Sequence, residues 1–148
     1  MTVLDFPAAR ADAHVITFDV IGDPVAFARS RHNGRQHFMP VKQRRAMSAI
    51  QEAAIKAKGR HHIWTGVPLA MEVSACFAYP ASWPKYRKVE QWKTSKPDAD
   101  NLGKIVADAC NGILYADDAQ ISVMTMAKTY GPEAKITVSF HAIQGGPQ

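Results

Sequence analysis

The chain has few cysteines, no long apolar run and no repeated segment. Its two cysteines, Cys76 and Cys110, have no CxxC partner, which argues against a disulfide scaffold or a cysteine-ligated metal. No apolar stretch is long enough to span a bilayer, and the first residues lack the apolar core of a signal peptide. We therefore expect a soluble cytoplasmic protein whose cysteines are small, reduced, buried residues.

Acidic residues are also scarce, except in one segment. The 148 residues contain 18 Lys and Arg against 13 Asp and Glu, which gives a formal net charge of +5. Between Lys96 and Ile121, however, five aspartates surround a short helical pattern with one internal cation, Lys104. Carboxylates this dense repel one another unless a cation neutralises them. An acidic site in a basic protein favours metal-dependent chemistry on a polyanion such as nucleic acid.

Hydrophobic periodicity predicts one domain over residues 14–142, with flexible tails at 1–13 and 143–148. Strands are expected at 14–22, 36–39, 69–79, 120–128 and 134–142, the last two joined as an antiparallel hairpin. Helices are expected from Pro40 to Gly59 and from Asp100 to Cys110, and residues 81–95 should form a long exposed loop. This order predicts an α+β (mixed α/β) fold, with a single mixed sheet packed against two main helices.

The acidic segment predicts a divalent-cation site. Pro97 favours extended backbone before it, so Asp98 and Asp100 should project to the same side and share one ion. Capping of the following helix explains one of these acids, but not both, and not the pair Asp117 and Asp118 beyond the helix. Mg²⁺ prefers oxygen ligands. The predicted metal ligands are therefore Asp98, Asp100, Asp117 and Asp118.

Three charged residues are spaced along one face of the second predicted helix. Lys104 lies one turn after Asp100, and Asp108 lies one turn after Lys104. We expect Lys104 to contact the reacting phosphate or the charge that develops on it. For Asp108, a functional role and a surface salt bridge both stay open.

Basic residues gather in two places. The stretch 29–60 has nine Lys or Arg against one acid, and the loop 85–96 has five against one. A solvated surface is the usual meaning of such a run, but glycine and asparagine in the first stretch and aromatic residues in the second favour phosphate gripping and base stacking. The predicted DNA-contacting residues are Arg29, Arg31, Arg35, Trp83, Lys85, Arg87, Lys88, Lys93 and Lys96, with Tyr86 and Trp92 in the same aromatic loop.

The acidic segment resembles the signature of the RusA family of Holliday junction resolvases, found in bacteria and their phages. Similar stretches at 27–31, 39–40, 82–85 and 128–130 extend the resemblance over roughly residues 15–140. One departure is Gly103, a poor helix former where the family often has a larger residue. The residues that carry the resemblance are Lys96-Pro97-Asp98-Ala99-Asp100-Asn101-Leu102, Lys104, Asp108, Asn111-Gly112, Tyr115, Asp117-Asp118 and Gln120-Ile121.

The resemblance implies a RusA-like fold and a homodimeric, Mg²⁺-dependent endonuclease, in which Mn²⁺ can substitute. Such enzymes resolve four-way DNA junctions in recombination and repair by paired nicks that leave 5′ phosphates. By position, it implies that Asp98, Asp100 and Asp118 are the catalytic carboxylates and Lys104 the catalytic lysine. Neither a membrane partner nor a small-molecule cofactor is expected.

Two other functions are compatible with the residues alone. One is a non-catalytic DNA-binding module whose acids hold a structural ion. The other is a nucleotide-sugar transferase, in which a DxD motif also chelates a divalent cation. The length of 148 residues argues against the transferase, because it leaves no room for a second, nucleotide-binding domain.

Overall fold

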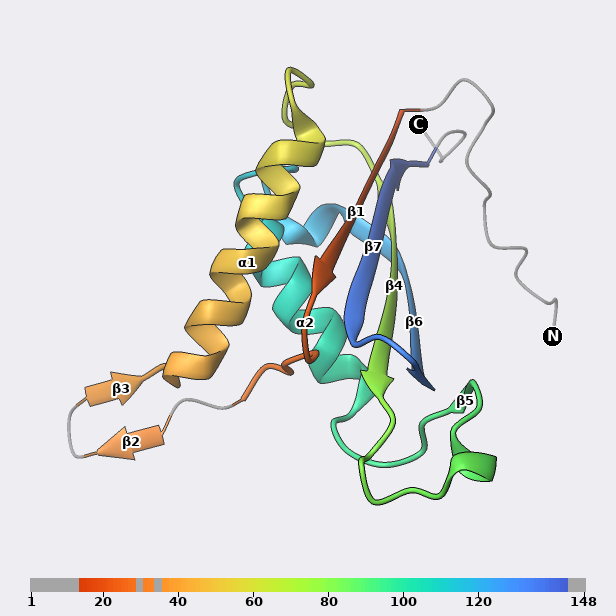
Figure 1. Ribbon diagram of the computed structural model, residues 1–148. Helices are drawn as coiled ribbons and strands as arrows, with labels where there is room; N and C mark the ends of the chain where they lie inside the picture. Colours follow the sequence, from red (N-terminus) through yellow and green to blue (C-terminus); the bar gives the residue numbers. More distant parts are fainter. Residues whose placement is uncertain (1–13, 29–30, 34–35, 144–148) are drawn as a thin grey trace, which may run out of the picture.

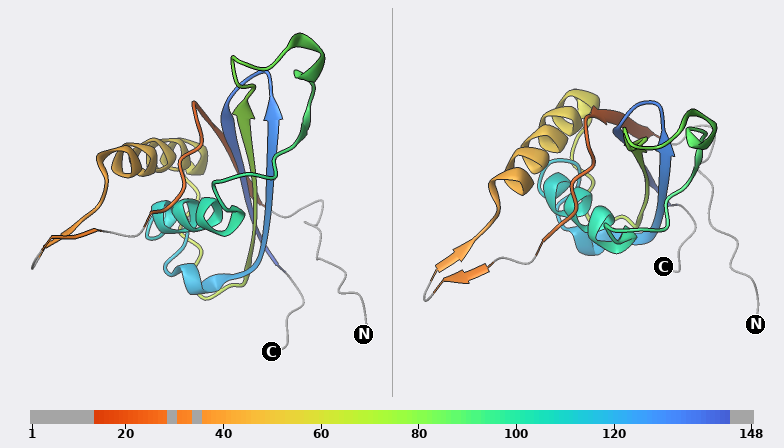
Figure 2. Two further views of the ribbon diagram at one scale, coloured as in Figure 1. Left: turned by 90° about the horizontal axis from the view of Figure 1, so that it is seen from below. Right: turned by 60° about the horizontal axis from the view of Figure 1, so that its bottom comes forward.

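A five-stranded mixed sheet forms the centre of the molecule. The computed structural model describes residues 14–28, 31–33 and 36–143. The sheet order is β1-β7-β4-β6-β5, and both long helices pack on the same face (Figures 1 and 2). This arrangement confirms the predicted α+β fold. The elements are β1 (Val15–Ile21), α1 (Val41–Lys58), β4 (Leu69–Ala78), β5 (Gln91–Trp92), α2 (Ala99–Cys110), β6 (Ile121–Gly131) and β7 (Lys135–Ala142).

Two short strands stand apart from this sheet. β2 (Arg31–Asn33) and β3 (Gln36–Phe38) pair with each other, and they project from the start of α1 (Figure 2). The strand predicted at 36–39 therefore exists, and its partner β2 is a strand that the sequence did not predict. The predicted tails fall outside the described residues, apart from Ile143, whose N–H donates to the carbonyl of Pro68 at 2.8 Å. Among the described helices, none is long and apolar enough to cross a membrane.

The core lies between the sheet and the two helices. Alternate residues of β1, β4 and β7 face the helices, as a period of two requires, and α2 buries its apolar side against them. Burial raises the pKa of the Cys110 thiol to about 12, which keeps this cysteine protonated and unreactive. The fully buried side chains include Ile50, Leu69, Met71, Leu102, Ile105, Val106, Val138 and Phe140.

The hairpin predicted for the last two strands is wrong. β6 and β7 do not pair with each other, because β4 lies between them, parallel to β6 and antiparallel to β7. The chain crosses the end of β4 after Gly131, where a Cβ atom would stand 2.6 Å from Cys76 Sγ. Glycine suits this position because a larger residue would crowd the Cys76 side chain. β4, the most apolar strand, is thereby buried between two partners.

This crossing can be tested with Gly131→Ala. The added methyl group should destabilise the protein by about 1–3 kcal/mol, because the crowded Cys76 sulfur leaves no room for it. Chemical denaturation of Gly131→Ala, Cys76→Ala and the double variant measures the coupling. The double variant should recover most of the loss. Additive effects would contradict the close approach.

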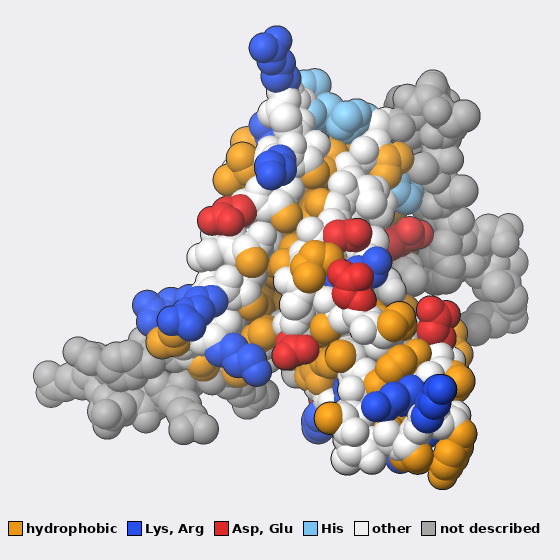
Figure 3. All heavy atoms as spheres, in the orientation of Figure 1, with side chains coloured by type: hydrophobic (Ala, Val, Ile, Leu, Met, Phe, Trp, Pro, Cys, Tyr) orange, Lys and Arg blue, Asp and Glu red, His pale blue; other side chains and the backbone are white. Residues whose placement is uncertain are grey.

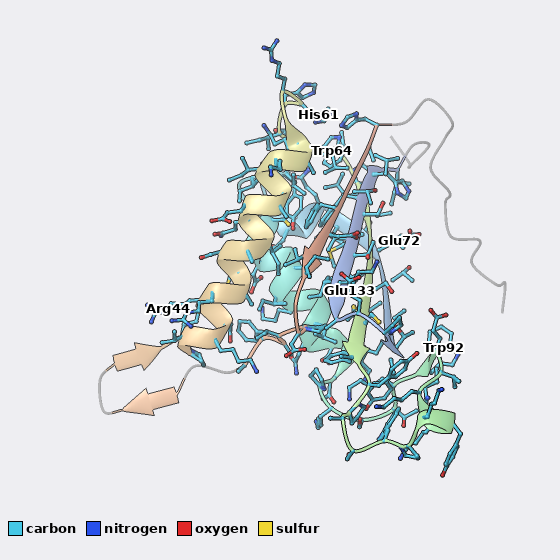
Figure 4. The ribbon with its side chains drawn as sticks, viewed as in Figure 1. Arg44, His61, Trp64, Glu72, Trp92 and Glu133 are labelled. Carbon is cyan, nitrogen blue, oxygen red and sulfur yellow. The ribbon has the colours of Figure 1, made fainter. Side chains whose placement is uncertain are left out.

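The segment before α2 is more ordered than a long exposed loop. It contains a 3₁₀ turn, η1 (Lys85–Arg87), and β5 pairs with the end of β6. The Trp83 ring packs against the Tyr130 ring, with centroids 4.7 Å apart. The Arg87 guanidinium lies 3.9 Å from the centre of the Trp83 ring. Tyr86 and Trp92 are instead 85% and 73% exposed, and Trp92 lies at the outer side of this loop (Figure 4).

Candidate active site

One face of α2 carries the charged side chains of that helix. Asp100, Lys104 and Asp108 stand four residues apart and so share one side. The Lys104 Nζ lies 3.4 Å from Asp108 Oδ2 and 4.6 Å from the centre of the Phe27 ring. Phe27 is held there because its N–H donates to the carbonyl of Asn101 at 3.0 Å. The ammonium is thus held between a carboxylate and an aromatic face, one helical turn from Asp100.

A short loop after α2 reverses the chain. Gly112 turns it with a φ of 81°, a conformation that favours glycine. The buried Tyr115 hydroxyl then donates to the carbonyl of Ala107 in α2 at 2.6 Å, and the N–H of Ala116 donates to the carbonyl of Trp64 at 3.0 Å. These bonds fix the loop to α2 on one side and to the chain leaving α1 on the other.

The next turn, η2 (Asp118–Gln120), presents Asp118. Its first turn is closed by a capping box, in which the Asp117 carboxylate accepts the N–H of Ala119 at 2.9 Å and the Gln120 side chain accepts the N–H of Asp117 at 3.0 Å. The Gln120 amide also donates to the carbonyls of Trp64 and Val67, at 3.3 and 3.1 Å. Trp64 lies beyond the end of α1 (Figure 4). Asp118 therefore stands on a rigid support.

These elements enclose a hollow of about 290 Å³ between α2 and the start of β6. Three aspartates and one lysine face it, and apolar side chains form its floor. A larger hollow of about 510 Å³ lies between α1 and the end of β1, but Asp23 is the one acid in its lining. The smaller hollow is therefore the candidate site. Its lining residues are Asp100, Lys104, Ala107, Asp108, Asp118, Ile121, Ser122 and Met124.

The electrostatics of Asp118 are those of a crowded carboxylate. Its partial burial, hydrogen bonding with Asp117 and the nearby charges of Asp108 and Asp117 all raise the pKa of Asp118, while Lys104 opposes them. A raised pKa means that the folded protein holds this carboxylate in an unfavourable charged state at neutral pH. Binding of a cation would relieve that cost.

The structure separates the predicted ligands into two groups. Asp100 and Asp118 face the hollow together. Asp98 lies at the start of α2, where both its oxygens are 3.0 Å from the Lys96 ammonium; it caps the helix by position without a side-chain bond. Asp117 is occupied in the capping box. In the part of the chain that the structure describes, no three His, Cys, Asp or Glu side chains are already arranged to hold a metal.

The donor chemistry nevertheless fits Mg²⁺. This ion keeps several waters and binds through one or two carboxylates plus substrate phosphate, and Asp100 and Asp118 supply two carboxylates beside one hollow. Histidine and cysteine are missing from its lining. The available ligands are therefore carboxylate oxygens, which suit Mg²⁺, and not the nitrogen and sulfur ligands that are typical of zinc and copper sites. The assignment of ligands stays a prediction.

Most of the predicted DNA-contacting residues lie on the segment between β4 and α2. Lys85, Arg87 and Lys88 are exposed on the segment between β4 and α2, where Figure 3 shows basic side chains mixed with hydrophobic ones at the lower right. Lys93 is different, because its ammonium donates to Tyr130 and Ser95 within the protein. Arg31 begins β2, whereas Arg29 and Arg35 lie outside the described residues. In the chain, β2 comes shortly after Phe27, whose N–H donates to the carbonyl of Asn101 in α2.

Comparison with known proteins identifies the family of the chain. The family model of endodeoxyribonuclease RusA matches residues 22–141, which include the whole of the site. The chain belongs to the RusA endodeoxyribonuclease family. It is also 30% identical over 139 residues to a protein of Bacillus subtilis (strain 168) called uncharacterized protein YqaN, covering 86% of this chain and 96% of that one. Membership of a nuclease family decides against a nucleotide-sugar transferase.

Two features of this RusA domain escaped the sequence analysis. Phe27 was counted with the basic segment, although its ring packs on Lys104. Gly103, the departure from the family pattern, lies where a Cβ atom would stand 2.7 Å from Met124 Sδ, so it lets α2 pack closely on β6. A glycine inside a helical pattern was the signal for close packing in the sequence.

The raised pKa of Asp118 gives a stability prediction for the RusA domain. Without metal, the folded protein should lose stability as pH rises through this pKa, because it binds the proton more tightly than the unfolded chain does. Asp118→Asn should therefore melt at a higher temperature than the wild type at pH 7, and the difference should shrink on acidification. Mg²⁺ should raise the melting temperature of the wild type more than that of the variant.

Calorimetric melts of both proteins, with and without Mg²⁺, measure these shifts. Asp19→Asn is the matched control, since Asp19 is exposed on β1 away from the hollow. A variant that melts no higher than the wild type would show that Asp118 is not under charge repulsion.

Proposed function

We propose that this protein is a Mg²⁺-dependent endodeoxyribonuclease that resolves four-way DNA junctions by paired nicks. The observation that carries the proposal is the pocket in which Asp100, Asp118 and Lys104 converge within a RusA-family domain. The carboxylates of this pocket outnumber its one ammonium group. The excess negative charge would attract a cation, and the ammonium would attract a phosphate.

Asp100 and Asp118 would hold the metal, and Asp98 would join them once DNA draws Lys96 away. A bound divalent cation supplies positive charge that polarises the phosphate and eases deprotonation of the attacking water. Mn²⁺ has the same preference for oxygen ligands and would substitute. Asp117 would act indirectly, because its carboxylate holds η2 in shape.

Lys104 would stabilise the charge that develops on the phosphate during attack. Its ammonium already lies at the hollow, and Asp108 and Phe27 restrict its position. A positioned donor of this kind contributes because it needs no rearrangement in the transition state. In this proposal Asp108 has a supporting role, because its salt bridge with Lys104 would hold the ammonium at the hollow.

A second copy of the chain would complete the reaction on a branched substrate. Four-way junctions present equivalent strands in pairs, and a two-fold homodimer would place one hollow at each of two such strands. The basic side chains on the segment before α2, together with the predicted Arg29, Arg31 and Arg35, would contact the arms through phosphates.

The decisive experiment is a nicking assay on a synthetic four-way junction, with a linear duplex of the same sequence as control. We expect symmetric nicks in the junction that require Mg²⁺ or Mn²⁺ and leave ligatable 5′ phosphates. Tight junction binding without nicking in either metal would favour the alternative, a non-catalytic DNA-binding module. Equal nicking of the duplex would remove the specificity for branched DNA.

The basic loop gives a second measurable expectation. Lys85→Ala and Lys88→Ala should each lower the slope of log affinity against log salt by about 0.9, because each removes one phosphate contact. Fluorescence anisotropy of a labelled junction over a salt series measures this slope. Lys135→Ala, on β7, is a control of equal charge, and its slope should match the wild type. Unchanged slopes in the loop variants would remove Lys85 and Lys88 from the DNA surface.

A further inference from the structure

The chain that enters the active site is tied to β6 by a lysine with no role so far. Lys128 is half-buried near the end of β6. Its Nζ donates to the carbonyl of Ser95 at 2.9 Å and to that of Pro97 at 2.9 Å. These carbonyls belong to the two residues on either side of Lys96, and Pro97 directly precedes Asp98. One ammonium therefore fixes two points of the short segment that leads to Asp98.

A second lysine strengthens this attachment. The N–H of Lys93 donates to the carbonyl of Lys128 at 3.0 Å, and its ammonium donates to the Tyr130 hydroxyl and to Ser95 Oγ, both at 2.9 Å. The same ammonium lies 4.9 Å from the centre of the Phe77 ring. Both lysines thus use their ammonium groups inside the protein, although the net positive charge of this region suggests DNA contacts.

The geometry explains why lysine suits this place. A protonated amine offers three donors on a flexible stem, and bonds from a charged donor to carbonyls are stronger than neutral ones. Residues 95–97 lie beyond β5 and before α2, and they belong to none of the strand pairs of the described chain. Lys128 supplies the donor that a sheet or helix would otherwise provide. Lys96 and Asp98 themselves remain exposed and paired to each other.

We propose that Lys128 is a positioning residue of the active site, whose ammonium holds the carbonyls of Ser95 and Pro97 and thereby sets the positions of Asp98 and of the first turn of α2. The inference rests on the proposed function for its catalytic consequence. Its structural part, the restraint of residues 95–100, stands independently. Lys128 touches neither substrate nor metal in this assignment.

Three variants test the proposal. Lys128→Met keeps the length of the side chain and removes its donors, while Lys128→Arg keeps a charged donor group that can reach both carbonyls. Lys135→Met is the matched control, because it removes one positive charge from β7, a strand that β4 separates from β6. Hydrogen exchange without metal or DNA reports on the segment itself. Single-turnover cleavage across a Mg²⁺ series and junction binding in Ca²⁺ report on function.

For Lys128→Met we expect faster exchange confined to residues 94–102. We also expect a loss of about 10–100-fold in cleavage rate or in apparent Mg²⁺ affinity, the range typical for partners that orient metal ligands. Junction affinity should stay within about twofold, since no phosphate contact is lost. Lys128→Arg should recover most of the activity, and Lys135→Met should match the wild type in every measurement.

Other outcomes overturn the proposal in distinguishable ways. A lower salt slope for junction binding, with unchanged cleavage of bound DNA, would make Lys128 a phosphate contact. Faster exchange throughout the protein with a lower melting temperature would make it a general structural residue. Failure of the wild type to cleave any junction would overturn the proposed function. The positioning role has its own test whether or not the wild type cleaves. It would be refuted if amide hydrogen exchange of residues 94–102 were the same in Lys128→Met as in the wild type.

Discussion

Asp100→Asn and Asp118→Asn will each abolish junction cleavage and leave junction binding intact. Both carboxylates face the hollow beside Lys104, and each substitution removes a negative charge that would hold the metal. We expect a loss of about a thousandfold or more, since several kcal/mol of transition-state stabilisation depend on the bound cation. Binding could only tighten, because less negative charge then faces the phosphates.

Single-turnover cleavage and a binding titration on the same junction measure the two effects. Asp98→Asn is expected to follow the same pattern, although Asp98 is paired with Lys96 in the absence of DNA. Asp19→Asn, on the exposed side of β1, should cleave like the wild type. Near-normal cleavage by any one of the three site variants in Mg²⁺ would remove that residue from the set of ligands.

Lys104→Ala should lower the cleavage rate by roughly a hundredfold or more with little change in affinity, which is the size of effect expected when one transition-state donor is lost. The reason is its location. The Lys104 ammonium lies at the hollow, 3.4 Å from Asp108 and over the Phe27 ring. It is not part of the basic segment between β4 and α2.

Asp108→Asn separates the effect of the Lys104 charge from the effect of its position. It keeps the lysine but weakens the attraction that positions it, so the loss should be smaller than for Lys104→Ala. The same cleavage and binding measurements apply. Equal losses of rate and affinity in Lys104→Ala would make Lys104 an ordinary DNA-binding residue.

The sequence was sufficient to group Asp100, Lys104 and Asp108, because helical periodicity alone places them on one face. Asp118 could be expected nearby, since a helix followed by Asn111-Gly112 has to turn back. The position of Asp98 could not be predicted. It depends on Lys128, a residue far along the chain whose ammonium holds the carbonyls of Ser95 and Pro97.

The errors of prediction share one physical cause. Gly131 and Pro132 end a strand equally well before a hairpin and before a crossing, so the local turn signal could not reveal that β4 lies between β6 and β7. Likewise, residues 81–95 have no usable period and were predicted to form a long exposed loop, but Trp83 packs against Tyr130 on β6 and β5 pairs with the same strand. Pairings between distant segments decide both cases, and periodicity contains no information about them.

The position of β7 also constrains the order in which the chain can fold during synthesis. β7 is the last strand, yet it lies between β1 and β4, and Val15 in the first strand is opposite His141 in the last. β1 therefore has no partner in the sheet until nearly all of the described chain has left the ribosome. Pairing across such sequence distances is slow, and an unpaired strand edge invites association with other chains. Truncation within β7 should thus leave β1 without its partner in the sheet and make the nascent protein dependent on chaperones.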